Sequence, residues 1–104
     1  MENKTISEQI AKIIQLCYQI NSVETNQEET GNLPTVFLDF MGHTCQLNIR
    51  IYDEGWASGE NPDFSACVYL DKSLNDVSTE LSKLIERLGV TLKLKARKER
   101  KRNV

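Results

Sequence analysis

The sequence has little of what several protein classes need. Its 104 residues include two prolines, one histidine and one tryptophan, and they show no internal repeat or low-complexity tract. Apolar runs extend for only a few residues, whereas a helix that crosses a bilayer needs about 20. The segment 1–4 lacks the charged and apolar regions of a signal peptide. We therefore expect neither a membrane protein nor a repeat protein, and a cytoplasmic location.

Cysteine is also scarce, and its placement favours free thiols. Cys17, Cys45 and Cys67 are an odd number and form no Cys-x-x-Cys pair, which is typical of a reducing compartment. A zinc site of His43, Cys45 and either Cys67 or Cys17 would have a spacing that matches no recurrent ligand pattern. We expect no metal and no cofactor.

What is present suffices for one domain. Hydrophobic residues make up 39% of the chain and charged residues 27%, a composition that can build a core. The formal net charge of −2 hides a strong asymmetry, because residues 93–104 hold seven bases and one acid. The remaining chain has six bases and fourteen acids, a formal charge of −8. Such an acidic body repels nucleic acid and anionic membranes and attracts basic proteins.

Hydrophobic periodicity predicts the first helix and a hairpin. Residues 6–20 carry apolar side chains on one helical face, with Thr5 and Glu8 as a capping box. Residues 36–40 and 45–51 alternate as half-buried strands. If Gly42-His43 is a two-residue turn, one face of the hairpin is apolar throughout: Phe40 lies opposite Cys45, Leu38 opposite Leu47, and Val36 opposite Ile49.

The rest of the chain predicts a third strand and a second helix. Residues 64–70 alternate again, and residues 76–88 carry a helical apolar stripe that ends at Gly89, where a C′ glycine belongs. Residues 90–95 then alternate as a short last strand. A competing interpretation continues the helix past Gly89 into the basic run.

These elements give an α+β two-layer sandwich, an antiparallel sheet of three to four strands packed against two helices in the order α-β-β-β-α-β. We expect a single domain over residues 1–96, with an acidic mobile loop at 21–34, and a frayed basic tail at 97–104. The helices should cover Leu38, Phe40, Leu47, Ile49, Val68 and Leu70. The opposite face should show Phe37, Asp39, Gln46, Asn48, Arg50, Tyr52, Cys67 and Tyr69, and a partner or a second copy of the chain is the expected occupant.

The sequence offers little support for an enzyme. His43 lies at a predicted turn, Cys45 points into the predicted core, and Asp71-Lys72 lacks the residue that a restriction-type metal site places between acid and lysine. The interpretation that remains is a binding surface for a basic partner, with Trp56 as its anchor. Trp56 has an alternative use, folding back over the end of the sheet. The residues assigned to this surface are Glu28, Glu29, Asp53, Glu54, Trp56, Glu60 and Asp63.

A second functional hypothesis uses the opposite charge. The basic tail would contact phosphates of RNA or DNA, a guide RNA included. The residues assigned to this role are Lys93, Lys95, Arg97, Lys98, Arg100, Lys101 and Arg102.

Three segments carry a resemblance to a known group of proteins. Residues 40–44 (a Gly-His turn), 49–56 (a strand and Gly-Trp loop) and 64–71 resemble small accessory proteins of phages and mobile elements in Gram-positive bacteria, over about residues 36–88. Among these are anti-CRISPR proteins that inhibit the type II RNA-guided nuclease. The resemblance implies a non-enzymatic inhibitor that blocks guide RNA or DNA engagement. It assigns no residue, because that group shares no binding signature.

Overall fold

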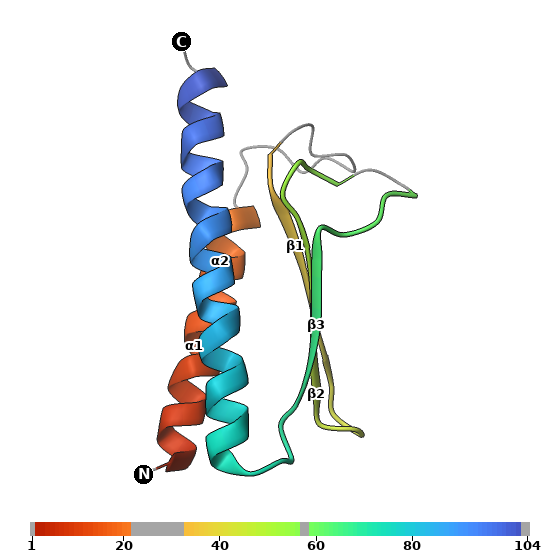
Figure 1. Cartoon of the computed structure of the whole chain (residues 1–104), viewed down its shortest axis with the longest axis vertical. Coiled ribbons are helices and arrows are strands. Elements are labelled where there is room, and N and C mark those ends of the chain that lie inside the picture. The colour runs from red at the N-terminus through yellow and green to blue at the C-terminus, as the bar shows by residue number, and fades with distance from the viewer. Residues whose placement is uncertain (1, 22–32, 57–58, 103–104) are drawn as a thin grey trace.

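A computed structural model describes residues 2–21, 33–56 and 59–102. Its elements are α1 (Glu2–Asn21), β1 (Thr35–Met41), β2 (Gln46–Tyr52), β3 (Phe64–Tyr69) and α2 (Leu74–Arg102). Both helices lie on one side of the sheet, so the molecule has two layers (Figure 1). The α+β sandwich expected from the sequence is confirmed in the order α-β-β-β-α.

The sheet is antiparallel with β2 in its middle. Leu38 faces Ile49 rather than Leu47, so the expected two-residue turn is wrong. The β1–β2 connection has four residues, 42–45, and Cys45 adopts a φ of 51°. The register therefore moves by two residues. Because strand side chains alternate with a period of two, the side chains that belong to β1 and β2 keep their expected faces. Cys45 lies in the turn instead of in β2 and is exposed, so its expected place in the core is wrong.

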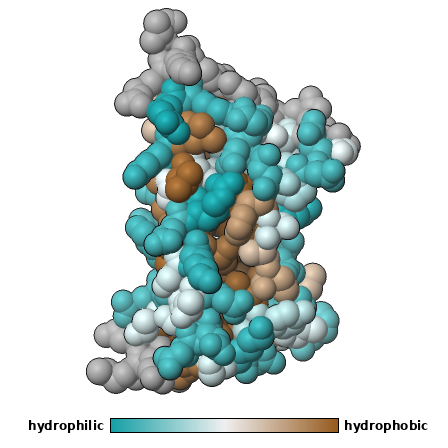
Figure 2. Space-filling model, in the orientation of Figure 1, coloured by the Kyte–Doolittle hydropathy of each residue, from teal (hydrophilic) through white to brown (hydrophobic). Residues whose placement is uncertain are grey.

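The hydrophobic core lies between the helices and the sheet. Full burial of one large apolar side chain stabilises the fold by about 1.5–3 kcal/mol relative to its exposure. Figure 2 shows hydrophobic residues along the junction between the two layers, with hydrophilic residues on both sides. The buried members are Ile13, Leu16, Cys17 and Ile20 of α1, Val36, Leu47, Ile49, Ile51 and Val68 of the sheet, and Val77, Leu81, Leu84 and Leu88 of α2.

The two helices lie side by side and run in the same direction (Figure 1). Near their starts, Gln9 Nε2 donates to Ser78 O at 3.0 Å. Near the end of α1, Lys95 Nζ donates to Gln19 O at 2.6 Å. Gln19 belongs to the last turn, whose carbonyls have no partner within the helix. A cation there also interacts favourably with the helix dipole, which explains why a lysine is buried.

α2 is continuous from Leu74 to Arg102, and this contradicts three expectations. The last strand at 90–95 does not form, the tail from Arg97 is helical through Arg102, and Gly89 lies inside the helix rather than after it. The competing interpretation of a continuous helix is confirmed. At 1.5 Å per residue such a helix is about 44 Å long, close to the 46 Å longest dimension of the molecule.

The helix starts also differ from those expected. α1 begins at Glu2, so Thr5 lies within the helix and the predicted capping box at Thr5 is wrong. α2 begins two residues early because Ser73 caps it. The Asp76 N–H donates to Ser73 Oγ at 3.3 Å, and the Val77 N–H donates to Ser73 O at 3.0 Å. A hydroxyl at this position satisfies a backbone donor that the helix leaves unpaired.

Two residues on the sheet differ from their expected burial. Phe40 shares the helix side of the sheet with Val36 and Leu38, yet 63% of it is exposed. Its expected place beneath the helices is therefore wrong. Tyr52 lies on the opposite side, which we call the outer face, and is only 4% exposed.

Neither helix of the described chain is long and apolar enough to cross a membrane.

Candidate binding surface

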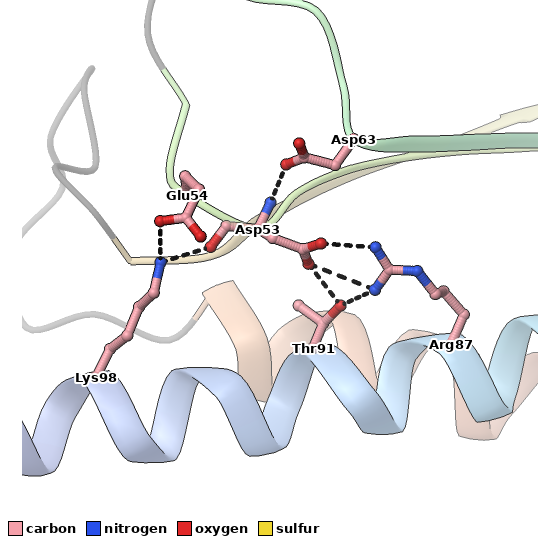
Figure 3. Close-up of polar contacts among 6 residues, drawn as sticks. All are labelled: Asp53, Glu54, Asp63, Arg87, Thr91 and Lys98. Atoms are coloured by element: carbon pink, nitrogen blue, oxygen red, sulfur yellow. Dashed lines mark hydrogen bonds and ion pairs between the residues drawn. The ribbon is translucent and has the colours of Figure 1, made fainter.

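Asp53 follows β2 directly and ties the β2–β3 loop (residues 53–63) to α2. Its carboxylate accepts hydrogen bonds from Arg87 Nη2 at 2.6 Å and from Thr91 Oγ1 at 3.0 Å (Figure 3). Arg87 Nη1 also donates to Thr91 Oγ1 at 2.6 Å, and its guanidinium lies 5.3 Å from the ring centre of Phe64. The Arg87 and Asp53 side chains are 24% and 22% exposed, so solvent screens this ion pair only in part.

The backbone of Asp53 is held as well. Lys98 Nζ donates to Asp53 O at 2.8 Å and to Glu54 Oε2 at 2.9 Å (Figure 3). The Asp53 N–H donates to Asp63 Oδ2 at 2.7 Å. The start and the end of the loop are thereby joined to each other and to the helix. The carboxylates of Asp53 and Asp63 thus have intramolecular partners.

An aromatic cluster of Phe37, Tyr52 and Trp56 lies on the outer face beside this loop. The Phe37 ring centre is 5.6 Å from that of Tyr52 and 5.8 Å from that of Trp56. The Arg50 guanidinium lies 4.7 Å from the centre of the Phe37 ring. Trp56 therefore folds back onto the sheet, on its outer face. Phe37 and Trp56 remain partly exposed.

The acidic candidates from the sequence divide into three groups. Asp53, Glu54 and Asp63 come together in the network on α2. Glu60 is exposed in the loop. Glu28 and Glu29 lie outside the described residues, as does most of the expected acidic loop at 21–34.

The basic candidates divide in a similar way. Lys95 is 5% exposed and Lys98 contacts the loop, so both have structural roles. Lys93 and Arg97 are exposed and lie one turn apart on α2. Residues 100–102 belong to the last turn of α2, and their side chains lie outside those that the structure describes.

The residues of the hypothetical zinc site are dispersed. Among the described residues, no group of three His, Cys, Asp or Glu side chains is arranged to hold a metal. Cys45 and Cys67 are exposed, whereas Cys17 lies in the core. Burial raises the pKa of the Cys17 thiol from 9.0 to about 11, which makes it a poor nucleophile and a poor metal ligand at neutral pH.

The sequence interpretation missed Arg87 and Thr91. A signal was present, because residues 77, 81, 84, 88, 91, 95 and 98 are spaced alternately by four and three. This is the spacing of one continuous helix face. Its last three members are Thr91, Lys95 and Lys98, and an apolar pattern does not detect polar residues.

Comparisons of the chain with protein-family models, with curated proteins and with solved structures find no match.

Proposed function

We propose that the protein is a non-enzymatic binding protein whose contact surface combines the outer face of the sheet with the β2–β3 loop. The observation that carries this proposal is the aromatic cluster of Phe37, Tyr52 and Trp56, which is partly exposed beside a loop fixed to α2. Both helices pack on the other face of the sheet (Figure 1). Tryptophan is among the residue types that most often dominate the binding energy of an interface.

Charge favours a basic partner. Asp39 on the outer face and Glu60 in the loop are exposed, and the chain before residue 93 carries a formal charge of −8. Asp53 and Asp63 support the loop instead of forming the contact, because their carboxylates bind within the chain. Glu54 contacts Lys98, but its side chain is 76% exposed and can still meet a partner. Complementary charge mainly raises the association rate, and packed aromatic anchors set the residence time.

The target that we propose is a type II RNA-guided nuclease, and the protein would then be an anti-CRISPR inhibitor acting in the bacterial cytoplasm. This finer proposal follows from the resemblance over residues 36–88. Such a nuclease holds guide RNA and target DNA in strongly basic channels. An acidic domain of this size competes for those surfaces, so inhibitor and nucleic acid should exclude one another.

The test is an equilibrium titration against the nuclease, with and without bound guide RNA. We expect binding to the apo-nuclease that pre-bound guide weakens. Trp56→Ala should weaken the binding at least about tenfold, as loss of an anchor residue does. Val90→Ala is the matched control, since it also truncates an exposed apolar residue but lies on α2, on the other side of the sheet.

Two results would count against the proposal in different ways. Full binding by the Trp56 variant would remove the aromatic cluster from the contact surface. Absence of binding to either nuclease form would exclude the anti-CRISPR role.

The second candidate function is contact with nucleic acid through α2. The observation that favours it is the continuity of α2, which places Lys93 and Arg97 exposed on one side of a helix that runs on to Arg102. A gel-shift titration with guide RNA and duplex DNA tests it. Lys93→Glu with Arg97→Glu should abolish the shift, whereas Lys83→Glu, also exposed on α2, should preserve it. An unchanged shift in the double variant would exclude this surface.

A further inference from the structure

β1 is an edge strand whose outward backbone groups are covered at one end. Asn21 Nδ2 donates to Val36 O and the Val36 N–H donates to Asn21 Oδ1, both at 2.8 Å. The Asn21 amide thus takes the place of a neighbouring strand. Outward-facing groups recur at every second residue of an edge strand, so those of Leu38 and Phe40 point the same way. None of the hydrogen bonds among the described residues reaches them.

One side of α1 flanks this open edge. Ile14, Tyr18 and Asn21 follow the i, i+4, i+7 spacing of a single helix side. Because Asn21 contacts β1, Ile14 and Tyr18 lie on the side of α1 that is turned toward β1. Ile14 is 52% exposed and Tyr18 is 74% exposed, and Phe40 across from them is 63% exposed. Large apolar side chains are therefore exposed on both sides of the open edge.

The lengths of the two elements match along this edge. From the Asn21–Val36 contact, α1 and β1 run in opposite directions (Figure 1). Ile14 is about 10 Å along the helix from Asn21 at 1.5 Å per residue. Leu38 and Phe40 are about 7 and 14 Å along the strand from Val36. Ile14 is thus level with the open stretch between Leu38 and Phe40, so an extended chain paired with β1 there would lie beside α1.

Charge argues against a second copy of the chain at this open edge. A twofold pairing of β1 with itself that satisfies the groups of Leu38 and Phe40 is centred on Asp39. It places the two Asp39 carboxylates directly opposite each other, and like charges in that position are destabilising. Asp39 is exposed and has no ion pair among the described residues. The same carboxylate favours a basic residue on the opposite strand.

We propose that the open edge of β1 binds an extended segment of a partner protein as a fourth strand, with a basic residue opposite Asp39 and an apolar residue on each side of it. The two apolar residues exchange backbone hydrogen bonds with Leu38 and Phe40. Their side chains lie on the helix side of the sheet, toward Ile14 and Tyr18. This site is separate from the aromatic cluster, and it does not depend on the identity of the protein bound there.

The probe is the acetylated and amidated peptide Thr-Val-Lys-Val-Thr, titrated into isotope-labelled protein. We expect saturable shifts of the Leu38 and Phe40 amide signals and slower hydrogen exchange at both. N-methylation of the two valines keeps their side chains and removes both N–H donors. It should weaken binding about tenfold, the loss expected for two backbone hydrogen bonds.

Two pairs of protein variants test the side-chain contacts. Asp39→Lys should lower the affinity for the lysine peptide about fivefold and raise the affinity for the peptide Thr-Val-Glu-Val-Thr about fivefold. Asp71→Lys, at an exposed acid in the turn after β3, should change neither affinity. Tyr18→Ala should weaken both peptides. Val90→Ala, which shortens an exposed apolar residue of α2, is its matched control.

Three results would overturn the proposal. One is the absence of saturable shifts at millimolar peptide. Another is protection of amides on β3, the other edge of the sheet, with those of Leu38 and Phe40 unchanged. The third is protection of the Leu38 and Phe40 amides without peptide in a protein that has twice the monomer mass in solution, which would assign the open edge to a second copy.

Discussion

Asp53 and Glu54 are neighbouring acids with different environments. The Asp53 carboxylate accepts from both Arg87 and Thr91 in a partly buried site, whereas the Glu54 side chain is 76% exposed. Hydrogen bonds to a charged group contribute about 1.5–3 kcal/mol, but exposed ion pairs contribute about 0–1 kcal/mol. Asp53→Ala should therefore lower the free energy of unfolding by about 2 kcal/mol, measured by urea denaturation.

Glu54→Ala is the control for that measurement. It removes an acid one residue away, and its effect should stay within about 0.5 kcal/mol. Equal losses of unfolding free energy in the two variants would mean that the hydrogen bonds of Asp53 with Arg87 and Thr91 do not stabilise the fold. The negative charge of the loop would then account for the effect.

Cys17 gives a pH dependence whose direction follows from its burial. The pKa of this thiol is about 11 in the folded protein against 9.0 ordinarily, so the folded state disfavours the thiolate. Its contribution is complete below pH 9 and is lost as the pH rises from about 9 to about 11. The full loss is about 3 kcal/mol, since one pKa unit corresponds to 1.36 kcal/mol.

The measurement compares unfolding free energies of the wild type and Cys17→Ala across that window. Other groups titrate there too, so the difference between the two proteins is the relevant quantity, and it should shrink as the pH rises. If the difference in unfolding free energy stayed constant with pH, burial would not be raising the pKa of the Cys17 thiol. As an independent check, a thiol reagent at pH 8 should label Cys45 and Cys67, which are exposed, and spare Cys17 until the protein unfolds.

At the scale of elements, Gly89 separates the two interpretations of the C-terminal third. Inside a helix, glycine is less favourable than alanine by about 0.5–1 kcal/mol, and a Cβ at Gly89 would meet nothing within 4 Å. Gly89→Ala should therefore stabilise the protein by that amount in thermal or urea denaturation. At a helix-terminating C′ position the same substitution would be destabilising, because the left-handed conformation there favours glycine.

Gly59→Ala is the matched control. A Cβ there also meets nothing, but the φ of Gly59 is +86°, which side chains rarely adopt. We expect a loss of stability from strain alone. Destabilisation by both substitutions would contradict a continuous α2.

The β-hairpin shows which features a sequence pattern can determine. Alternation predicted the faces of β1 and β2, and a register error of two residues left those faces intact. The turn itself was not predictable from the Gly42-His43 pair. Cys45, a residue that seldom adopts positive φ, has the left-handed conformation in this four-residue connection.

The second half of α2 shows why part of the site escaped prediction. An apolar pattern recognises Leu84 and Leu88 but not Thr91 and Lys95, which are buried because they bind Asp53 and the Gln19 carbonyl. Those partners lie far away in the sequence, so only the folded chain brings them together. Composition identified the acidic residues of the β2–β3 loop as candidates. It could not show that Asp53 and Glu54 bind residues of α2.

At the scale of the whole molecule, the charge asymmetry becomes an asymmetry in space. α2 carries its basic residues toward one end of the longest axis of the molecule (Figure 1). Removal of residues 99–104 takes away three bases and one acid, which changes the formal net charge from −2 to −4. Lys98 stays, so the contacts of α2 with Asp53 and Glu54 are preserved.

The two proposed functions predict opposite effects of this truncation. If the partner is a basic protein, the more acidic chain should associate with it faster, severalfold at low ionic strength, because charge steers encounter. The gain should fade as salt shortens the Debye length to about 8 Å at 0.15 M. If the partner is nucleic acid, loss of three cations should weaken binding and flatten its salt dependence. Stopped-flow association with the nuclease, alongside a salt titration with RNA, distinguishes these outcomes by their sign.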